Sequence, residues 1–408
     1  LAAPPSKSMA HRAVLCAALA DGESRLTGLA HSQDIDATLA AAAALGAQVE
    51  AGEGWARIAG AAPLQAPAAP VDCCESGSTL RFLIPLAALT GRPVAFTGRG
   101  RLMQRPQSVY QELFASQGLR FEQEGDTLTV AGPLRPGCFS LAGDVSSQFI
   151  SGLLFALPLL DGDSRLCLKP PVESRSYIEM TRASQSRFGV ASAWLDEYTL
   201  AVPGGQAYRP RDMAIEGDWS QAAFPAALGV LAGDVTVTGL EPGTLQGDAV
   251  ILDILRRCGG RAEAVPGGVR FQKSALHGTK IDLADCPDLG PILMALGLLC
   301  EGETVITNAG RLRLKESDRI AAMEQELRKL GGRIESDGGT VTIRRSALHA
   351  PAGPLWGHND HRVVMSLTVL AAAAGLPVQI DGAEAVAKSW PGFFAAVRQL
   401  GVEVQTDA

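Results

Sequence analysis

The feature that most constrains the fold is a six-fold internal repeat. Six times along the chain, a polar or charged cluster is followed by an apolar stretch of helical length that ends at a glycine. The six terminal glycines lie 69 to 73 residues apart and are Gly22, Gly91, Gly162, Gly233, Gly302 and Gly375. A fixed period of this kind is typical of stacked units that bury a shared core. We therefore expect six similar structural units.

Each unit contains further elements in a constant order. The terminal glycine is followed by a short β-branched run, as at 304–307, and then by a second helical stretch that ends at another glycine. The first helix of a unit is apolar nearly all round, as at 149–160, which predicts burial on every side. The second is amphipathic, and after Lys315 its apolar stripe is formed by Ile320, Met323, Leu327 and Leu330. We predict an α/β (α+β) fold with inner helices, outer helices and sheet between them.

Length and local composition predict two domains. A chain of 408 residues exceeds what one hydrophobic core normally serves. The Pro/Gly-rich stretch 202–212 separates the third repeat from the fourth, which gives three repeats to each domain. The chain begins with Leu1, and the sixth unit ends after 402–405 without a closing strand. We expect that a segment preceded Leu1 and supplied that strand.

Composition excludes several classes of function. A net charge of −7, with 47% hydrophobic and 19% charged residues, describes a globular protein without a general nucleic-acid or anionic-membrane surface. The eight cysteines show no zinc spacing, and we expect most to be buried free thiols, as at Cys16, Cys167 and Cys300. No signal peptide and no run of about 18–20 apolar residues is visible. A reducing cytoplasm fits this pattern.

Basic and hydroxyl residues gather where the first helices of the units begin. A helix start offers unpaired N–H groups and the positive end of the helix dipole, which suits an anion. Lys7, Ser8 and Arg12 lie at one such start. Ser146, Ser147 and Gln148 lie at another, where three polar donors exceed what helix capping needs. These starts therefore predict a site for more than one anionic group, although a capped helix with solvated cations is the alternative.

The second half of the chain supplies more charged candidates. The run 311–319 holds four cations and two acids, so it needs counter-charges from elsewhere. Asp288 precedes an apolar run, where an N-cap and a functional carboxylate are equally good interpretations. His361 and Arg362 open the sixth inner helix, and Lys388 follows its strand. Each of these residues alone is more typical of a structural or solvated side chain.

Together these motifs resemble the family of 5-enolpyruvylshikimate-3-phosphate (EPSP) synthases, the 3-phosphoshikimate 1-carboxyvinyltransferases. The resemblance is carried by residues 5–12, 145–148, 314–319 and 359–362 and covers essentially the whole chain. It implies a two-domain enolpyruvyl transferase fold with three βαβ-containing units in each domain. The first domain is expected at 6–213 and the second at 1–5 plus 214–408, with the active site in the cleft between them.

The resemblance also implies a reaction. The enolpyruvyl group of phosphoenolpyruvate passes to the 5-hydroxyl of shikimate 3-phosphate by addition and elimination, and phosphate is released. Such an enzyme serves aromatic amino acid biosynthesis, needs no metal or organic cofactor, and has no nucleic-acid or membrane partner. We expect a cytoplasmic monomer. Gly77 resembles the position linked to glyphosate sensitivity, so the protein is expected to be a glyphosate target.

Site residues follow from matching the family motifs to this sequence. The resemblance assigns shikimate 3-phosphate to Lys7, Ser8, Arg12, Ser146, Ser147, Gln148, Ser174, Tyr177, Asp288 and Lys315. It assigns phosphoenolpyruvate to Lys7, Gly77, Arg101, Gln148, Arg319, Arg362 and Lys388. Asp288 is expected to take the hydroxyl proton, and Glu316, with Lys7, to handle the proton at C3 of phosphoenolpyruvate.

Two departures from the family and two rival functions remain open. Glu75 stands where many members carry Asn, and Arg311 where they often carry a different residue, so the roles of both are undetermined. The sister enzyme, UDP-N-acetylglucosamine enolpyruvyl transferase, is the nearest alternative, but the loop 98–103 lacks the Cys usual in that family. A repeat scaffold that binds partner proteins is an alternative of a different class.

Overall fold

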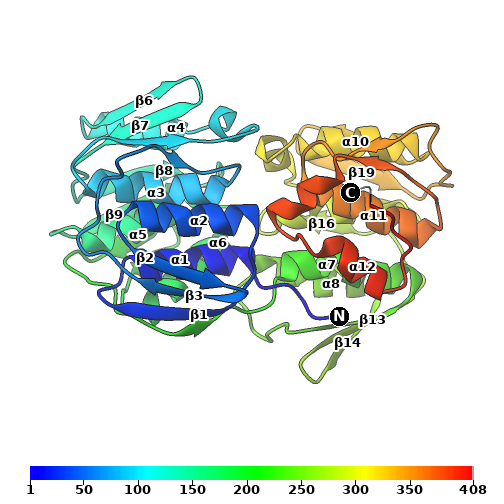
Figure 1. The fold of residues 1–408 in the computed structure, drawn as a ribbon. Coiled ribbons are helices and arrows are strands. Elements are labelled where there is room, and N and C mark those ends of the chain that lie inside the picture. The colour runs from blue at the N-terminus through cyan, green and yellow to red at the C-terminus, as the bar shows by residue number, and fades with distance from the viewer. Residues whose placement is uncertain (407–408) are drawn as a thin grey trace. The chain divides into compact units, whose positions relative to one another are not determined.

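A computed structural model describes residues 1–406 and has an α/β fold (Figure 1). The chain divides into two compact units. The first unit is Pro5–Ile215, and the second is Leu1–Pro4 together with Glu216–Ala408. The N-terminal residues belong to the second unit because the amino group of Leu1 donates to Thr236 O at 2.9 Å and Ala2 bridges to Thr238.

The first unit contains three repeats, each with an inner helix, an outer helix and a small sheet. The inner helices are α1 (Lys7–Ala18), α3 (Gly77–Leu89) and α5 (Ser147–Ala156), and the outer helices are α2 (Gln33–Ala44), α4 (Ser108–Ser116) and α6 (Arg175–Arg187). Two short 3-10 helices are η1 (Leu102–Gln104) and η2 (Leu157–Leu159).

Three four-stranded sheets cover these helices. Their orders are β12-β1-β3-β2, β4-β5-β7-β6 and β10-β11-β9-β8. The strands are β1 (Glu23–Leu29), β2 (Gln48–Gly52), β3 (Gly54–Ala59), β4 (Val71–Asp72), β5 (Val94–Thr97), β6 (Arg120–Glu124), β7 (Thr127–Ala131), β8 (Cys138–Ala142), β9 (Ser164–Lys169), β10 (Ala193–Trp194), β11 (Thr199–Val202) and β12 (Met213–Ala214). Each sheet combines one parallel pair with antiparallel hairpin pairing, as in β1, which is parallel to β12 and antiparallel to β3.

The second unit repeats this plan. Its inner helices are α7 (Trp219–Ala232), α9 (Gly290–Gly297) and α11 (His361–Ala374), and its outer helices are α8 (Ile251–Arg257), α10 (Arg319–Lys329) and α12 (Phe393–Gln399). The 3-10 helices are η3 (Gly247–Val250), η4 (Pro287–Leu289), η5 (Gly310–Leu314) and η6 (Ala383–Lys388).

The three sheets of the second unit differ in size, and that of the last repeat has only two strands. Their orders are β13-β15-β14, β16-β17-β19-β18 and β20-β21. The strands are β13 (Asp234–Thr238), β14 (Arg261–Val265), β15 (Gly268–Gln272), β16 (Lys280–Asp282), β17 (Glu303–Thr307), β18 (Arg333–Asp337), β19 (Thr340–Arg344), β20 (Leu355–Trp356) and β21 (Ile380–Asp381). Residues 402–406 form no strand, so the expected strand from a preceding segment stays a prediction.

The predicted contrast between inner and outer helices is confirmed. Helix α5 is buried from Phe149 to Ala156, because a helix that is apolar on all sides gains most by full enclosure. On α10 the predicted stripe is buried, whereas Glu324 and Arg328 lie outside it and form an ion pair. The inner helices thus form the interior of each unit, and their N-termini bring the polar clusters to its edge.

One expectation about cysteine burial is wrong. All eight cysteines are free thiols in the described part of the chain, and Cys16 and Cys300 are buried. Cys167 is half-exposed, however, and its Sγ lies 3.1 Å from that of the exposed Cys138. The reason is strand alternation: in β9 the residue faces outward beside Arg165, although its sequence neighbours are apolar.

Candidate active site

The start of α1 presents the first group of candidate residues. Ser6 caps the helix by accepting from Met9 N at 3.4 Å, which leaves Lys7 and Ser8 in the first turn. The Lys7 ammonium lies 2.6 Å from the Asp34 carboxylate of α2, and both side chains are largely buried. Because this ion pair fixes the ammonium, Lys7 is held in position rather than freely solvated.

Arg12 is anchored more firmly than a solvated cation would be. Its guanidinium donates to the Thr181 hydroxyl at 2.8 Å, Ser8 O at 2.7 Å and Tyr177 O at 2.9 Å. It also stacks on the rings of Phe82 and Tyr177. Burial lowers the pKa of Arg12 to about 10, so the group remains charged near neutrality. The structure therefore brings Ser8, Arg12 and Tyr177 together.

The start of α5 forms the next part of this cluster. Ser146 caps the helix by accepting from Gln148 N at 3.3 Å, and Ser147 is buried in the first turn. The Gln148 amide accepts from Arg81 of α3 at 2.8 Å and donates to Ser78 at 3.0 Å. Capping thus accounts for one of the three polar residues, and Arg81 and Ser78 orient another.

Ser174 lies at the start of α6 in a left-handed conformation with φ of 55°. That conformation is uncommon for a residue other than glycine. The side chain is buried, and Tyr177 follows it in the first turn of the helix. The two residues assigned from the family motif therefore lie on the helix that also supplies Thr181 to Arg12.

Gly77 faces an arginine that the sequence did not single out. A Cβ added to Gly77 would lie 2.8 Å from Nη1 of Arg105, which is buried. Arg101, the predicted phosphoenolpyruvate ligand, has an exposed side chain at the start of η1. The η1 turn separates the two arginines and directs only Arg105 inward. Both cations stand in the run 101–105, and the sequence of this run does not show which of them points inward.

In the second unit the candidates converge on Asp288. One oxygen of this carboxylate lies 3.1 Å from Lys315 Nζ and 3.2 Å from Arg319 Nη1, and the other lies 3.1 Å from Arg362 Nη2. Arg362 also donates to Asp288 O at 3.1 Å. The alternative that Asp288 is an N-cap is wrong, since α9 begins after Leu289 without a side-chain cap. Asp288 instead pairs with Lys315, which directly follows η5, and with cations from α10 and α11.

The ionisation of Asp288 depends on the cations that surround it. Burial alone would raise the pKa of Asp288, but Arg362, Lys315 and Arg319 outweigh it and hold that pKa well below its usual value. Burial lowers the pKa of Lys315, although Asp288 opposes the shift. Asp288 is therefore an ionised carboxylate that depends on its cationic neighbours. Any anion that draws those cations away raises its basicity.

Arg319 links Asp288 to two further carboxylates. Its guanidinium binds Asp360 at 2.8 Å and Glu316 at 2.8 Å, and its side chain is only 1% exposed. Asp360 caps α11 by accepting from Arg362 N at 2.9 Å and also accepts from Ser317 at 3.0 Å. The counter-charges that the run 311–319 lacked are thus supplied by Asp288 and Asp360.

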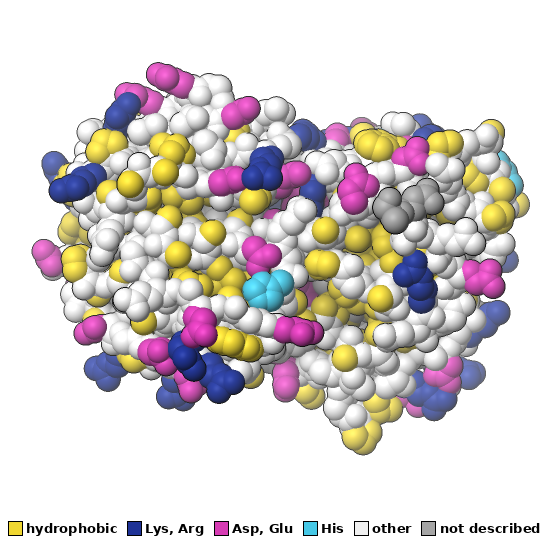
Figure 2. Space-filling view, viewed as in Figure 1, with side chains coloured by type: hydrophobic (Ala, Val, Ile, Leu, Met, Phe, Trp, Pro, Cys, Tyr) yellow, Lys and Arg dark blue, Asp and Glu magenta, His cyan; other side chains and the backbone are white. Residues whose placement is uncertain are grey.

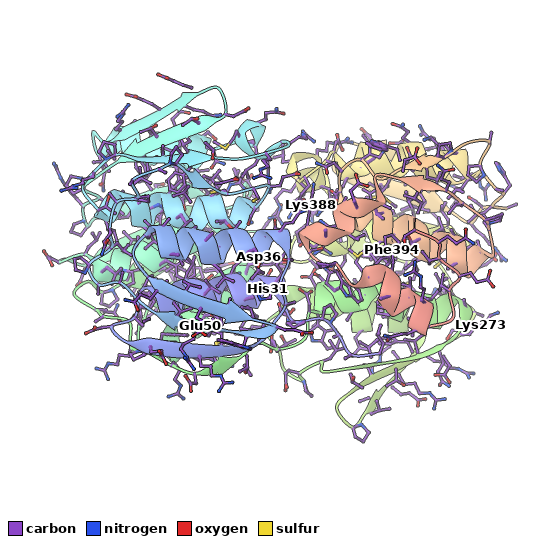
Figure 3. The ribbon with its side chains drawn as sticks, in the orientation of Figure 1. His31, Asp36, Glu50, Lys273, Lys388 and Phe394 are labelled. Carbon is purple, nitrogen blue, oxygen red and sulfur yellow. The ribbon has the colours of Figure 1, made fainter. Side chains whose placement is uncertain are left out.

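Lys388 completes the second cluster. It ends η6, is buried, and donates to the Asn359 carbonyl at 2.6 Å (Figure 3). Asn359 immediately precedes Asp360, so the ammonium approaches the same loop that Arg319 contacts. The structure therefore brings Asp288, Glu316, Lys315, Arg319 and Arg362 together, and Lys388 contacts the adjoining backbone.

The surroundings add two observations about ligands and membranes. Lys/Arg and Asp/Glu side chains are interspersed over the face drawn in Figure 2. Residues 1–406 contain no group of three or more His, Cys, Asp or Glu side chains arranged to hold a metal ion. Within the same residues, no helix has the length and apolarity needed to cross a bilayer.

Comparison with known proteins gives a consistent result. Residues 1–397 match the family model described as EPSP synthase (3-phosphoshikimate 1-carboxyvinyltransferase). A 3-phosphoshikimate 1-carboxyvinyltransferase of Clostridium kluyveri is 41% identical over 403 residues, which cover 98% of this chain and 94% of the relative. The enzyme of that name from Clostridium acetobutylicum is 40% identical over 408 residues, with the same coverage.

Solved structures show the same fold. An EPSP synthase structure from Acinetobacter baumannii has a TM-score of 0.80 at 23% identity and covers 100% of this chain and 97% of its own. An enolpyruvyl transferase from Streptomyces tendae has a TM-score of 0.77 at 16% identity, covering 99% and 95%. The predicted two-domain enolpyruvyl transferase class of fold is thereby confirmed.

Proposed function

The chain belongs to the EPSP synthase family, and from this premise we infer the chemistry of its charged clusters. As a 3-phosphoshikimate 1-carboxyvinyltransferase, it transfers the carboxyvinyl group of phosphoenolpyruvate to the 5-hydroxyl of shikimate 3-phosphate and releases phosphate. UDP-N-acetylglucosamine enolpyruvyl transfer is not favoured, since the matching family and the relatives are described as 3-phosphoshikimate 1-carboxyvinyltransferases. The observation that carries the mechanistic proposal is the pairing of Asp288 with Lys315, Arg319 and Arg362.

Substrate charge explains why so many cations are needed. Each phosphate carries about −1.5 to −2 charges, and both substrates add a carboxylate. Without neutralisation these groups would repel one another. We assign shikimate 3-phosphate to the helix starts and their neighbours, namely Lys7, Ser8, Arg12, Ser146, Ser147, Gln148, Ser174, Tyr177, Asp288 and Lys315. Guanidinium groups suit phosphates because they bind them with two parallel hydrogen bonds.

Phosphoenolpyruvate is assigned to a second set of cations and donors. This set keeps Lys7, Gly77, Gln148, Arg319, Arg362 and Lys388. We assign Arg105 to it in place of Arg101, because the Arg105 guanidinium is buried against Gly77, whereas the Arg101 side chain is exposed.

Asp288 is proposed as the base that accepts the 5-hydroxyl proton. Phosphoenolpyruvate anions compete with Asp288 for Arg319 and Arg362. When these cations turn to the substrate, the charges that depress the pKa of Asp288 are withdrawn, and its affinity for a proton rises. Glu316 shares the Arg319 guanidinium with Asp288, and we propose that Glu316, with Lys7, delivers the proton to C3.

The residues proposed to bind one substrate pair come from both compact units. We therefore propose that the domains are 6–213 and 1–5 with 214–408, and that the active site forms in the cleft between them. A cytoplasmic location and a monomeric state are also proposals. The first is supported by eight free cysteines, which are typical of a reducing compartment.

The function is tested by phosphate release from phosphoenolpyruvate with shikimate 3-phosphate, with UDP-N-acetylglucosamine, or without an acceptor. Release only with shikimate 3-phosphate is expected. Asp288→Ala is expected to lower kcat by about 10² or more, with a modest loss of shikimate 3-phosphate binding. Undiminished turnover would remove Asp288 from the mechanism without changing the assignment of the reaction.

A further inference from the structure

The loop between β20 and α11 has an unusual backbone. His358 and Asn359 both have φ of 52°, so two successive residues other than glycine are in the left-handed region. Such conformations are uncommon and unfavourable, and they persist where surrounding contacts enforce them. The loop is further confined at Gly357, because a Cβ there would lie 2.6 Å from the Val364 side chain.

One buried carboxylate on the outer helix α10 holds this loop. Glu326 is fully buried, and its carboxylate lies 3.1 Å from Nε2 of His358. It also accepts from the backbone N–H of Trp356 at 2.9 Å and from Lys329 Nζ at 2.9 and 2.7 Å. Glu326 thus contacts the loop on both sides of Gly357. Lys329 supplies the positive charge that a buried carboxylate needs.

The loop in turn sets the position of three cations. The Asn359 carbonyl accepts from Lys388, and its direction is fixed by the left-handed backbone on which it stands. The next residue, Asp360, binds the Arg319 guanidinium and caps α11 through the N–H of Arg362. A change in the path of residues 356–359 would therefore move the groups that orient Lys388, Arg319 and Arg362.

We propose that Glu326 is a positioning residue for phosphoenolpyruvate binding. It holds the His358–Asn359 backbone in its left-handed form and so keeps these cations at the spacing that the substrate's phosphate and carboxylate require. The proposal rests on the function inferred above. Glu326 does not contact the reacting atoms, and its effect is transmitted through the loop.

The test compares Glu326→Gln with Glu324→Gln in the full-length enzyme. Both variants lose one carboxylate from α10, but Glu324 contacts Arg328 and Ser336 rather than the loop. A glutamine at 326 has only one acceptor oxygen for three donors. We expect the KM for phosphoenolpyruvate to rise about tenfold, as loss of one charged hydrogen bond would produce. The KM for shikimate 3-phosphate should change by less than about twofold, and Glu324→Gln should change neither.

Two further variants separate positioning from general destabilisation. Glycine takes the left-handed conformation without strain, so Glu326→Gln/His358→Gly should recover part of the affinity for phosphoenolpyruvate that Glu326→Gln loses. If Glu326→Gln does not fold, His358→Phe removes the carboxylate contact at a half-exposed position and should raise the same KM selectively.

Equal rises in both KM values, or a lower melting temperature with unchanged kinetic constants, would overturn the proposal. A wild-type enzyme that releases no phosphate with shikimate 3-phosphate would instead contradict the proposed function.

Discussion

At the scale of single residues, Gly77 shows how the absence of a side chain controls a charged group. The guanidinium of Arg105 occupies the space that a Cβ would need, with Nη1 2.8 Å and Cζ 3.0 Å from its ideal position. In Gly77→Ala, Arg105 must therefore shift. We expect the KM for phosphoenolpyruvate to rise about tenfold, equivalent to about 1.4 kcal/mol of binding, and glyphosate inhibition to weaken with it.

Steady-state kinetics with each substrate varied in turn measures this effect. Gly353→Ala is a matched control because nothing lies within 4 Å of its added Cβ. An unchanged KM for phosphoenolpyruvate in Gly77→Ala would mean that Arg105 is not a ligand of that substrate.

A second residue-scale prediction concerns His31. Its Nδ1 lies 2.6 Å from Asp36, and its Nε2 lies 3.0 Å from Gly52 O (Figure 3). The hydrogen bond to Asp36 raises the pKa of His31 above its ordinary value. Since the folded-state pKa is raised, the stabilisation is complete below about pH 6.5 and is lost as the pH rises through the folded value. An NMR titration should give a midpoint above 6.5 that falls in Asp36→Asn. A wild-type midpoint at or below 6.5 would contradict the ion pair.

At the scale of elements, a buried hydroxyl chain connects three helices of the first unit. His11 of α1 lies 2.7 Å from the hydroxyl of Thr38 on α2, which lies 2.7 Å from that of Thr79 on α3. This series of hydrogen bonds ends at Ser76, the cap of α3, which accepts from Thr79 Oγ1 at 2.7 Å. These bonds fix the starts of α1 and α3, where Lys7 and Gly77 lie. Burial lowers the pKa of His11 well below its ordinary value, so the ring is neutral and fits this network.

Thr38→Val keeps the shape of the side chain and removes its hydroxyl. Three buried polar groups, the His11 ring, the Thr79 hydroxyl and the Asp34 carbonyl, then lose a partner, so the free energy of unfolding should fall by about 1–3 kcal/mol in urea denaturation. Thr38→Ser retains the hydroxyl and should lose only about 0.8 kcal/mol for its buried methyl group. Equal stability of Thr38→Val and the wild type would show that these hydrogen bonds contribute nothing to the packing of the three helices.

The helices and their burial were largely predictable, because the repeated apolar runs can only be buried in the interior. The stretch 149–160 has no polar face, so it had to be buried. The amphipathic stripe of α10 likewise predicted which side faces the sheet. The sequence could not show which of Arg101 and Arg105 points inward, since this depends on the η1 turn.

Other parts of the site could not be predicted from the sequence because they depend on tertiary contacts. Asp288 precedes an apolar helix as an N-cap would, and only the approach of α10 and α11 shows its cationic partners. Glu326 and Lys329 look like a solvated pair on an outer helix, because their spacing is common on exposed surfaces. The burial of Glu326 comes from the loop that precedes α11, which is about thirty residues away in sequence.

At the scale of the whole molecule, an acidic protein must bind two anionic substrates. The net charge is −7, and the proposed ligands include cations already paired with internal carboxylates. Lys7 pairs with Asp34 in the first unit, while Arg319 and Arg362 pair with Asp288 in the second. These pairs stabilise buried charge, and the substrates compete with them for the same cations. In the proposed assignment, binding of both substrates therefore depends on groups from both units.

The assignment of substrate ligands to both units predicts that ligand binding changes the distance between the two units. In the proposed assignment, the substrate pair contacts Arg12 of one unit and Arg362 of the other, so we expect binding of both substrates to bring the two units together. We expect shikimate 3-phosphate with glyphosate to lower the radius of gyration measured by small-angle X-ray scattering, and shikimate 3-phosphate alone to lower it less. Two independent ligands, each at a hundredfold excess over its Kd, would together stabilise the protein against thermal unfolding by about 5.4 kcal/mol, and the joint stabilisation should exceed this sum because each ligand binds a site that the other completes. Arg362→Met removes a cation of the second unit and should abolish the response to glyphosate while leaving that to shikimate 3-phosphate. An unchanged radius in the wild type, with both ligands shown to be bound, would contradict closure of the units around the substrates.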